Sequence, residues 1–590
     1  MGPQTLNDIF YTVVESGKKR VMLARNAGQW MPISSHALYR DVAGMAHAFC
    51  RWGAMKGDRI AILSENRPEW AVTDFASLLI GAVVVPIYAT LTAEQTAYIL
   101  RDSGARIAVV SSGDQLRKVL SIRRQTDLKR VVVMDSVETA EAVPMEPLMR
   151  KGPAGRDSAL DARAREITPD DLASIIYTSG TTGTSKGVQL THGNLTSNIL
   201  NSMEGFDVSG EHVSVSFLPL SHVTARHADL ALLYRGVTLA YCSFIDELPQ
   251  VLQEVMPTIF VAVPRVYEKI HNQVEQKVKA GMKRVVYRWS LSVGRAHHPI
   301  VMAGERPTSL TWRMAEKLVY SQVRERLGGK VKIFVSGGAP LGRELAEWYA
   351  SIGIRIHEGY GLTETSPVIA INSPRSHKLG AVGRPLSNVQ VRIADDSEIL
   401  VRGPSVFRAY WNRPEETRDA FVDGWFKTGD IGKLDEEGFL WVTDRKKDLL
   451  KTSGGKFIAP QPVENSLKLN ALIGTAVVLG DRRKFPSVLI SPHFPLLEEW
   501  ARDNRIGFSS KETLVAHPKV KILYESIVDD VNRSLARYEK LKRVLIVPEE
   551  FTAIDGSLTP TLKLRRKVIE ERYRKQIDEL YEQAEISRVA

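Results

Sequence analysis

A run of glycines and hydroxyl side chains at residues 177–192, YTSGTTGTSKGVQLTH, has the composition of a phosphate-binding loop. It follows the apolar stretch LASII and so begins where a buried strand would end. Glycines let backbone N–H groups turn toward an anion, the Ser and Thr hydroxyls add donors, and Lys186 supplies a mobile cation. A flexible linker has a similar composition, but linkers rarely follow a buried strand. The segment therefore predicts a polyphosphate site.

The same loop does not match the Walker A motif. No glycine directly precedes Lys186, and Gly187 stands where that motif has a metal-binding Ser or Thr. Kinases and GTPases of that type are therefore disfavoured. The chain also has no GxSxG nucleophile elbow, and His222 and His227 do not make a convincing metal-binding pair. Serine-hydrolase and metalloenzyme interpretations lose support for these reasons.

Further motifs follow the loop in order and, with it, span about 390 residues. They are FLPLSHV (217–223), VPRVYEKI (263–270), SGGAPL (336–341), EGYGLTETSP (358–367), GWFKTGDIG (424–432), DRKKDLLKTSGG (444–455) and TPTLKLRRK (559–567). This ordered set resembles the AMP-forming adenylating superfamily, which contains acyl-CoA synthetases, luciferases and the adenylation domains of peptide synthetases. Within it, VPRVYEKI, SGGAPL and TPTLKLRRK are most similar to the long-chain fatty acid-CoA ligases.

The resemblance implies a two-step reaction. A fatty acid carboxylate attacks the α-phosphate of ATP to give an acyl-AMP and pyrophosphate, and the thiol of CoA then displaces AMP. ATP, Mg²⁺ and CoA are the implied cofactor and substrates, and small molecules rather than nucleic acid are the implied partners. Two alternatives stay open: a fatty acyl-AMP ligase that loads a carrier protein, and a non-catalytic nucleotide-binding lipid-transport module.

The resemblance also assigns a role to individual residues. Lys563 would contact the carboxylate and α-phosphate during adenylation, His222 would position the substrate, and Lys447 would occupy the hinge. Glu364 and Thr178 would hold Mg²⁺, which favours a carboxylate plus phosphate oxygens. The nucleotide and CoA would be bound by Thr178, Ser179, Gly180, Thr181, Thr182, Gly183, Lys186, Gly337, Gly338, Ala339, Gly359, Tyr360, Gly361, Thr363, Asp430, Arg445 and Gly455.

Within that set the roles divide by motif. Residues 178–183 and Lys186 would cradle the β- and γ-phosphates. Tyr360 would lie against adenine, and Asp430 with Arg445 would bind the ribose. Gly455 would let the pantetheine of CoA pass. The same residues would often be core or surface residues if they stood alone.

Three positions depart from the pattern of relatives. Leu562 stands where shorter-chain members have a glycine before the catalytic lysine, which weakens an acetate-specific interpretation. Pro462 replaces a glutamate found in many relatives. The segment HVTARH lacks the acidic residue that many long-chain relatives place near Arg226.

Short β-branched runs such as RIAIL (59–63), RIAVVSS (106–112) and RVVVMD (130–135) alternate with helix-compatible segments, which favours an α/β fold with substantial parallel sheet. Short strands and turns at about 384–444 indicate a β-rich subdomain. Together with the resemblance, the prediction is a mixed α/β and α+β protein. It has a large N-terminal domain of stacked sheets (1–444) and a small mobile C-terminal α+β domain (445–590), with the hinge at 444–448.

Composition fits an intracellular globular protein. The chain is 44% hydrophobic and 25% charged, and its most apolar stretch, at 76–88, is too short to cross a bilayer. Only two cysteines occur, which excludes a disulfide scaffold. The net charge of +11 suits nucleic acid, anionic lipid or polyanionic small substrates. We expect a cytoplasmic protein with peripheral contact to the cytoplasmic membrane face through basic helices at about 266–290 and 563–574; its oligomeric state is left open.

Overall fold

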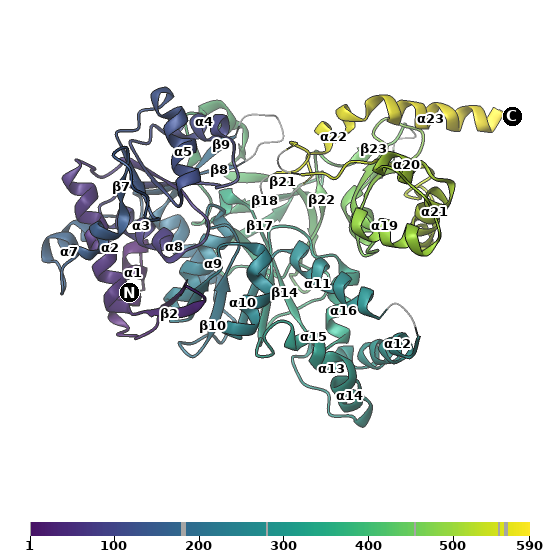
Figure 1. Cartoon of the computed structure of the whole chain (residues 1–590), viewed down its shortest axis with the longest axis horizontal. Helices are drawn as coiled ribbons and strands as arrows, with labels where there is room; N and C mark the ends of the chain where they lie inside the picture. Colours follow the sequence, from purple (N-terminus) through teal and green to yellow (C-terminus); the bar gives the residue numbers. More distant parts are fainter. Residues whose placement is uncertain are drawn as a thin grey trace.

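The computed structural model describes residues 2–178, 185–278, 281–453, 456–552, 555–559 and 564–589, the side chains of the last helix only as far as residue 582. The chain has a large N-terminal domain and a smaller C-terminal one, seen at the upper right of Figure 1, which confirms the predicted mixed α/β class. The strands expected at 59–63, 106–112 and 130–135 are present as β3 (Arg59–Leu63), β5 (Ile107–Val110) and β6 (Arg130–Val133).

The first large sheet carries the phosphate loop. Within the described residues its order is β19-β9-β8-β4-β3-β5-β6-β7, with the strands from β8 to β7 parallel. β9 is antiparallel to β8, so the two strands form a hairpin. The bounds of the other strands are β4 (Val83–Ile87), β7 (Val143–Pro144), β8 (Leu172–Thr178), β9 (Lys186–Thr191) and β19 (Ala409–Tyr410).

The second large sheet has the order β16-β15-β14-β13-β12-β10-β11-β1-β2 over the described part of the chain. Its central strands are parallel, and the N-terminal β1 joins it beside β11. The bounds are β1 (Met22–Asn26), β2 (Gln29–Ile33), β10 (Val213–Ser216), β11 (Thr238–Tyr241), β12 (Ile259–Ala262), β13 (Ile333–Ser336), β14 (Ile356–Gly361), β15 (Val368–Ile371) and β16 (Arg384–Pro385).

Helices join the two large sheets and cover their other faces. One continuous core contains apolar residues of both sheets together with α1 (Leu6–Glu15), α2 (Ser35–Arg51), α3 (Pro68–Leu79), α6 (Met145–Arg150), α7 (Ser158–Arg165), α8 (His192–Ser202) and α9 (Val223–Tyr234). A second core packs α4 (Ala93–Ser103) and α5 (Gly113–Ile122) on the first sheet. A third packs α10 (Leu248–Val255), α11 (Pro264–Lys277) and α16 (Arg343–Ser351) on the second.

Next to α11, the basic stretch of the sequence folds into a group of short helices. They are α12 (Gly281–Ala296), α13 (His298–Met302), α14 (Leu310–Ala315), the π-helical turn η3 (Glu316–Tyr320) and α15 (Ser321–Glu325). In Figure 1, α12, α13 and α14 project from the lower right edge of the molecule. Of the helices that the structure describes, none has the length and apolar character needed to cross a membrane.

The β-rich region forms a separate sheet of β17 (Gln390–Ile393), β18 (Glu398–Arg402), β20 (Phe421–Val422), β21 (Trp425–Leu434) and β22 (Leu440–Arg445), with α17 (Pro414–Asp419) beside it. In contrast, β16 and β19 extend the two large sheets. Because β19 lies beside β9, a segment more than 200 residues downstream lies next to the phosphate loop.

The C-terminal domain has its own hydrophobic core. Its sheets are β23 (Leu450–Lys451) with β24 (Phe457–Ile458), and β25 (Ile473–Leu479), β26 (Ser487–Pro492) and β27 (Val544–Ile546). Its helices are α18 (Pro460–Lys468), α19 (Phe494–Asp503), α20 (Lys511–Ala516), α21 (Pro518–Asn532), α22 (Arg566–Arg572) and α23 (Arg574–Val589).

Candidate active site

The β8–β9 hairpin fixes both ends of the phosphate loop. Thr178 and Lys186 are partners in the antiparallel register, so the residues that flank the loop lie opposite one another. A capping box then starts α8: the Thr191 side chain accepts from the Asn194 backbone N–H, and the Asn194 side chain accepts from the Thr191 N–H. The predicted phosphate ligands Ser179, Gly180, Thr181, Thr182 and Gly183 lie outside the described residues.

A tyrosine that no motif indicated connects the phosphate loop to the EGYGLTETSP segment. Tyr410 lies on β19, and its hydroxyl donates to Glu364 Oε1 at 2.8 Å. The ammonium Nζ of Lys186 lies 5.2 Å from the centre of the Tyr410 ring, within range of a cation–π interaction. Burial and the Glu364 charge raise the pKa of Tyr410, so its hydroxyl stays a donor. Lys186, Tyr410 and Glu364 therefore form one connected cluster.

Glu364 is held in place by its backbone and one side-chain oxygen. It lies in η4 (Thr363–Thr365), and its carbonyl accepts from the Phe407 N–H at 2.7 Å. Among the described residues no group of three or more His, Cys, Asp and Glu side chains could hold a metal ion. A single carboxylate nevertheless fits Mg²⁺, which is usually bound by one or two carboxylates together with substrate phosphates.

The predicted ribose-binding pair lies on adjacent strands. Asp430 of β21 is opposite Arg445 of β22, and the Arg445 Nε is 3.2 Å from Asp430 Oδ1. The hydroxyl of Tyr360, on β14, donates to the other Asp430 oxygen at 2.8 Å. Burial lowers the pKa of Arg445, but the charges of Asp430, Asp448, Tyr360 and Glu364 together outweigh it, and the net shift is upward. The structure thus brings together three residues from three separate motifs.

The predicted glycines have two different explanations. A Cβ on Gly361 would lie 1.7 Å from the Pro367 carbonyl oxygen, so close backbone packing requires glycine there. At Gly337 the nearest protein atom to a Cβ would be 3.6 Å away, and at Gly338 it would be 3.8 Å away. Gly338 has a φ of +81°, which favours glycine, whereas none of the residues that the structure describes excludes a side chain at Gly337. The space at Gly337 is consistent with a ligand.

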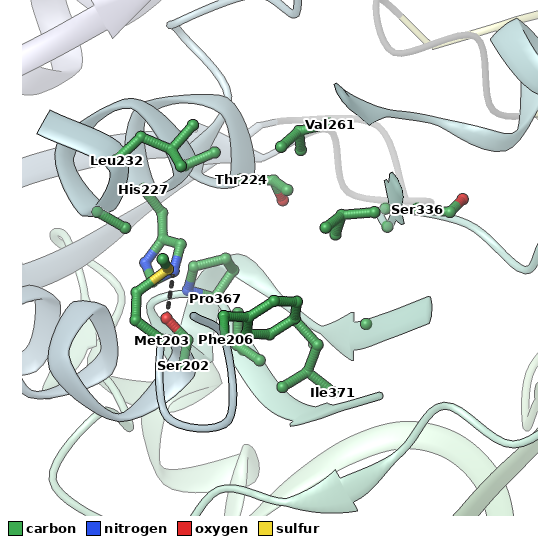
Figure 2. A pocket seen from close by; sticks show the side chains of 18 of the residues that line it. Ser202, Met203, Phe206, Thr224, His227, Leu232, Val261, Ser336, Pro367 and Ile371 are labelled. Atoms are coloured by element: carbon green, nitrogen blue, oxygen red, sulfur yellow. Dashed lines mark hydrogen bonds between the residues drawn. The ribbon is translucent and has the colours of Figure 1, made fainter. Parts of the chain in front are cut away.

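An apolar cavity lies between α9 and the second large sheet (Figure 2). Its wall includes Ser336, Gly337, Gly338, Gly359, Tyr360, Gly361 and Pro367 from the predicted motifs, and Ser202, Met203, Phe206, Val208, Thr224, His227, Ala228, Ala231, Leu232, Ile259, Val261, Ala262, Ile333, Val335, Val368 and Ile371 from elsewhere. Thr224 and Leu232 are eight residues apart on α9, which corresponds to about 12 Å. The cavity is therefore long as well as apolar.

Two polar side chains face each other in the wall of this cavity. The Ser202 hydroxyl is 2.9 Å from His227 Nε2, as the dashed line in Figure 2 shows. Burial lowers the pKa of His227 to about 4, so the imidazole is neutral at physiological pH. The predicted His222 lies at the N-cap of α9, where its Nδ1 accepts from the Thr224 N–H at 3.1 Å. His222 is not among the residues that line the cavity; it holds the end of the helix that does.

The acidic partner of Arg226 comes from a distant helix. The Arg226 guanidinium donates to both carboxylate oxygens of Asp74, on α3, at 2.9 and 2.6 Å, and both side chains are 3% exposed. Burial raises the pKa of Asp74, although Arg226 opposes this shift. The charge that the local sequence HVTARH lacks is thus supplied from 152 residues away.

Of the remaining predicted residues, Ala339 is exposed just after β13, and Gly359 and Thr363 are partly buried beside Tyr360. Lys563 and Gly455 lie outside the described residues. The segments around Lys563 are anchored: Leu558 and Leu564 form an antiparallel bridge. The C-terminal flank is further held by Arg566, which donates to the Glu464 carboxylate and to the Val478 carbonyl, both at 2.7 Å.

Comparisons with known sequences cover nearly the whole chain. Residues 10–411 match the family model described as AMP-binding enzyme, and residues 447–585 match the AMP-binding enzyme C-terminal domain. The long-chain-fatty-acid–CoA ligase FadD15 of Mycobacterium bovis is 37% identical over 566 residues, covering 94% of this chain and 93% of the relative. The long-chain-fatty-acid–CoA ligase ACSBG2 of Xenopus laevis is 32% identical over 631 residues, covering 99% and 84%.

Solved structures share the fold at lower identity. The anthranilate CoA ligase AuaEII in complex with anthranoyl-AMP superposes with a TM-score of 0.75 at 19% identity, covering 98% of this chain and 99% of that one. The A domain of a carboxylic acid reductase from Segniliparus rugosus, with AMP and a carboxylic acid bound, gives 0.78 at 20% identity and covers 98% and 94%. At this identity the likeness establishes the fold alone.

Proposed function

The chain belongs to the AMP-binding enzyme family, and from this premise we propose that it is an AMP-forming long-chain fatty acid-CoA ligase. It converts a fatty acid, ATP and CoA into acyl-CoA, AMP and pyrophosphate. The fatty acid carboxylate bonds to the α-phosphorus as pyrophosphate leaves. The CoA sulfur then bonds to the acyl carbonyl as AMP leaves.

The apolar cavity is the observation that supports a fatty acid as the substrate. Gly337, Gly338 and Tyr360 line one part of it, and most of the other lining residues are apolar. An alkyl chain placed there would be removed from water, which favours binding in proportion to the apolar area buried. Its carboxylate would then stay at the glycine end, beside the nucleotide residues. This arrangement supports an acid with a long aliphatic chain.

For the nucleotide, we infer that Asp430 and Arg445 bind the ribose and that Tyr360 contacts adenine. The Tyr360–Asp430 hydrogen bond and the Asp430–Arg445 ion pair hold the carboxylate and guanidinium in place before ATP arrives. Lys186 and the hydroxyls of the loop would neutralise the phosphates. Mg²⁺ would be held by Glu364, with Thr178 near it, and would offset negative charge on the phosphate oxygens.

The two half-reactions require different groups at one site. We propose that Lys563 reaches the carboxylate and α-phosphate for adenylation and leaves for thioester formation. A rotation of residues 445–590 against 1–444 at Lys447 would make this exchange, and Gly455 would then border the pantetheine of CoA. The anchoring of Arg566 by Glu464 supports a lysine that moves with the small domain as one unit.

Product analysis tests the proposed reaction. Wild-type protein supplied with ATP, Mg²⁺, CoA and straight-chain acids from hexanoate to octadecanoate should form AMP, pyrophosphate and acyl-CoA in equal amounts, with the highest kcat/KM for the long chains. Pyrophosphate and acyl-adenylate without acyl-CoA would indicate a carrier-protein acceptor. Absence of pyrophosphate with every acid would support a non-catalytic module and contradict the proposal.

The length of the cavity makes a separate prediction. Ala231 is on α9, seven residues beyond Thr224, and it lines the wall. We expect Ala231→Phe to lower kcat/KM for hexadecanoate about 10- to 100-fold, because overpacking of this size costs about 1–3 kcal/mol. Activity with hexanoate should change only a few-fold. Leu232→Ala, which widens the same region, is the control and should keep activity with hexadecanoate. An equal loss for both acids in Ala231→Phe would refute the placement of the chain.

Peripheral contact with the cytoplasmic face of an anionic membrane is a further proposal. Long-chain fatty acids partition into lipid, and the net charge of +11 favours an anionic surface.

A further inference from the structure

The helical projection formed by α12, α13, α14 and η3 exposes large apolar side chains to solvent. Six are at least 38% exposed: Met282 77%, Val285 63%, Ile300 38%, Leu310 74%, Met314 49% and Leu318 47%. Isolated exposed apolar residues are ordinary, but a group of them on one short segment marks an interaction surface. By contrast, α11 contributes no exposed large hydrophobic side chain among its described residues.

Three of these residues form a stripe on one helix face. Leu310, Met314 and Leu318 are spaced four residues apart along α14 and η3, so they lie one above another. The opposite face is buried, since Trp312 and Ala315 are 2% and 0% exposed and belong to the core on the outer face of the second sheet. The stripe is therefore directed away from the protein, and we name Leu310, Met314 and Leu318 the apolar stripe.

Basic side chains accompany the stripe. Residues 281–320 contain seven Lys and Arg but only two Asp and Glu. Of the acids, Glu316 is paired with Arg306 and Arg324, so it does little to offset the remaining positive charge. Arg313 and Lys317 directly precede Met314 and Leu318 and are exposed. Neither makes an ion pair with another residue that the structure describes.

A surface hollow at the start of α14 has two arginines in its wall, of which Arg306 is already paired with Glu316. It is lined by Arg306, Pro307, Thr308, Trp312, Arg313 and Glu316. Arginine matches phosphate geometry well, because its planar fork can donate two hydrogen bonds to one group. A phosphate headgroup could be held here while the neighbouring stripe contacts acyl chains.

We propose that the apolar stripe with Arg313 and Lys317 is the surface by which this protein docks on a membrane that contains anionic lipid. The combination of an outward apolar face and adjacent cations matches an interfacial helix, in which the apolar side chains enter the headgroup boundary and the cations meet lipid phosphates. The surface lies outside the nucleotide site and the cavity, so docking keeps the enzyme where fatty acids partition. The choice of lipid as the partner rests on the proposed function.

Vesicle flotation of the full-length protein tests this surface. At low salt, wild type should bind vesicles of phosphatidylcholine with phosphatidylglycerol, and bind pure phosphatidylcholine at least about tenfold more weakly. The triple variant Leu310→Ser, Met314→Ser, Leu318→Ser should lose about tenfold or more in binding to the mixed vesicles. Arg313→Gln with Lys317→Gln should weaken binding and reduce its salt dependence.

Matched controls use equally exposed residues elsewhere. Met55 and Ile522 are 65% and 64% exposed, and Met55→Ser with Ile522→Ser should bind as wild type does. Binding of the triple variant at the wild-type level, or equal loss in this control, would overturn the proposal. Light scattering tests whether a second copy of the chain, rather than a membrane, covers the apolar stripe. A wild-type oligomer that becomes monomeric in the triple variant would also overturn the proposal.

An activity assay distinguishes failure of the docking proposal from failure of the proposed ligase reaction. Without vesicles, wild type and the triple variant should form acyl-CoA from octanoate at the same rate. If neither forms acyl-CoA from any acid, the ligase proposal fails regardless of vesicle binding. If both are active but neither floats with anionic vesicles at low salt, the docking surface alone is wrong.

Discussion

Glutamine in place of Glu364 should slow pyrophosphate release about 100- to 1,000-fold, the range found when one electrostatic contact to a reacting group is removed. The substitution keeps the shape of the side chain and an oxygen that can accept from Tyr410, but it removes the negative charge. The backbone bond from the Phe407 N–H to the Glu364 carbonyl is unchanged. Single-turnover pyrophosphate release, measured across a Mg²⁺ titration, should show a higher Mg²⁺ requirement as well as a lower rate.

Tyr410→Phe is the matched control for this result. It leaves the Glu364 carboxylate intact and removes only the 2.8 Å hydrogen bond, while the ring that lies 5.2 Å from Lys186 remains. We expect a loss of about tenfold, the lower end of the about 1.5–3 kcal/mol that one hydrogen bond to a charged group contributes, because the backbone bond from Phe407 still holds Glu364 in place. A Glu364→Gln enzyme within threefold of wild type at every Mg²⁺ concentration would exclude Glu364 as the metal-binding carboxylate.

Lys563→Ala should separate the two half-reactions. We expect adenylation to fall about 100- to 1,000-fold, because the variant loses the cation that we propose to contact the carboxylate and α-phosphate. Thioester formation from supplied acyl-AMP and CoA should stay within a few-fold of wild type if, as we propose, this lysine leaves the site before the second step. Pyrophosphate release and acyl-CoA formation from acyl-AMP are measured separately.

Lys567→Ala provides the control for the loss of one positive charge in the same segment. Lys567 is exposed at the start of α22, four residues after Lys563. The Lys567→Ala variant should leave the rates of both half-reactions unchanged. Because Leu564 bridges Leu558 and Arg566 is held by Glu464, alanine at 563 should not unfold the flanking segments. An equal loss in both half-reactions would contradict the exchange of Lys563 between them.

The sequence alone determined the family, the reaction class and many of the strands. These features are encoded locally: alternating apolar runs specify β3, β5 and β6 at nearly their observed positions. Motifs whose residues act together within a short segment can be recognised from the sequence in the same way. The predicted ribose-binding pair is such a case, since TGD and DRK each carry one partner and the β21–β22 register places Asp430 opposite Arg445.

Tertiary structure decided the features that depend on contacts between distant segments. Tyr410 meets Glu364 across 46 residues, and Asp74 meets Arg226 across 152, so no local spacing indicates either pair. The cavity wall is built from ordinary apolar residues such as Phe206 and Leu232, which in sequence look the same as core. The exposure of the apolar stripe was also decided by tertiary structure. Its period predicts an amphipathic helix, and only packing determines which face is covered and which meets solvent.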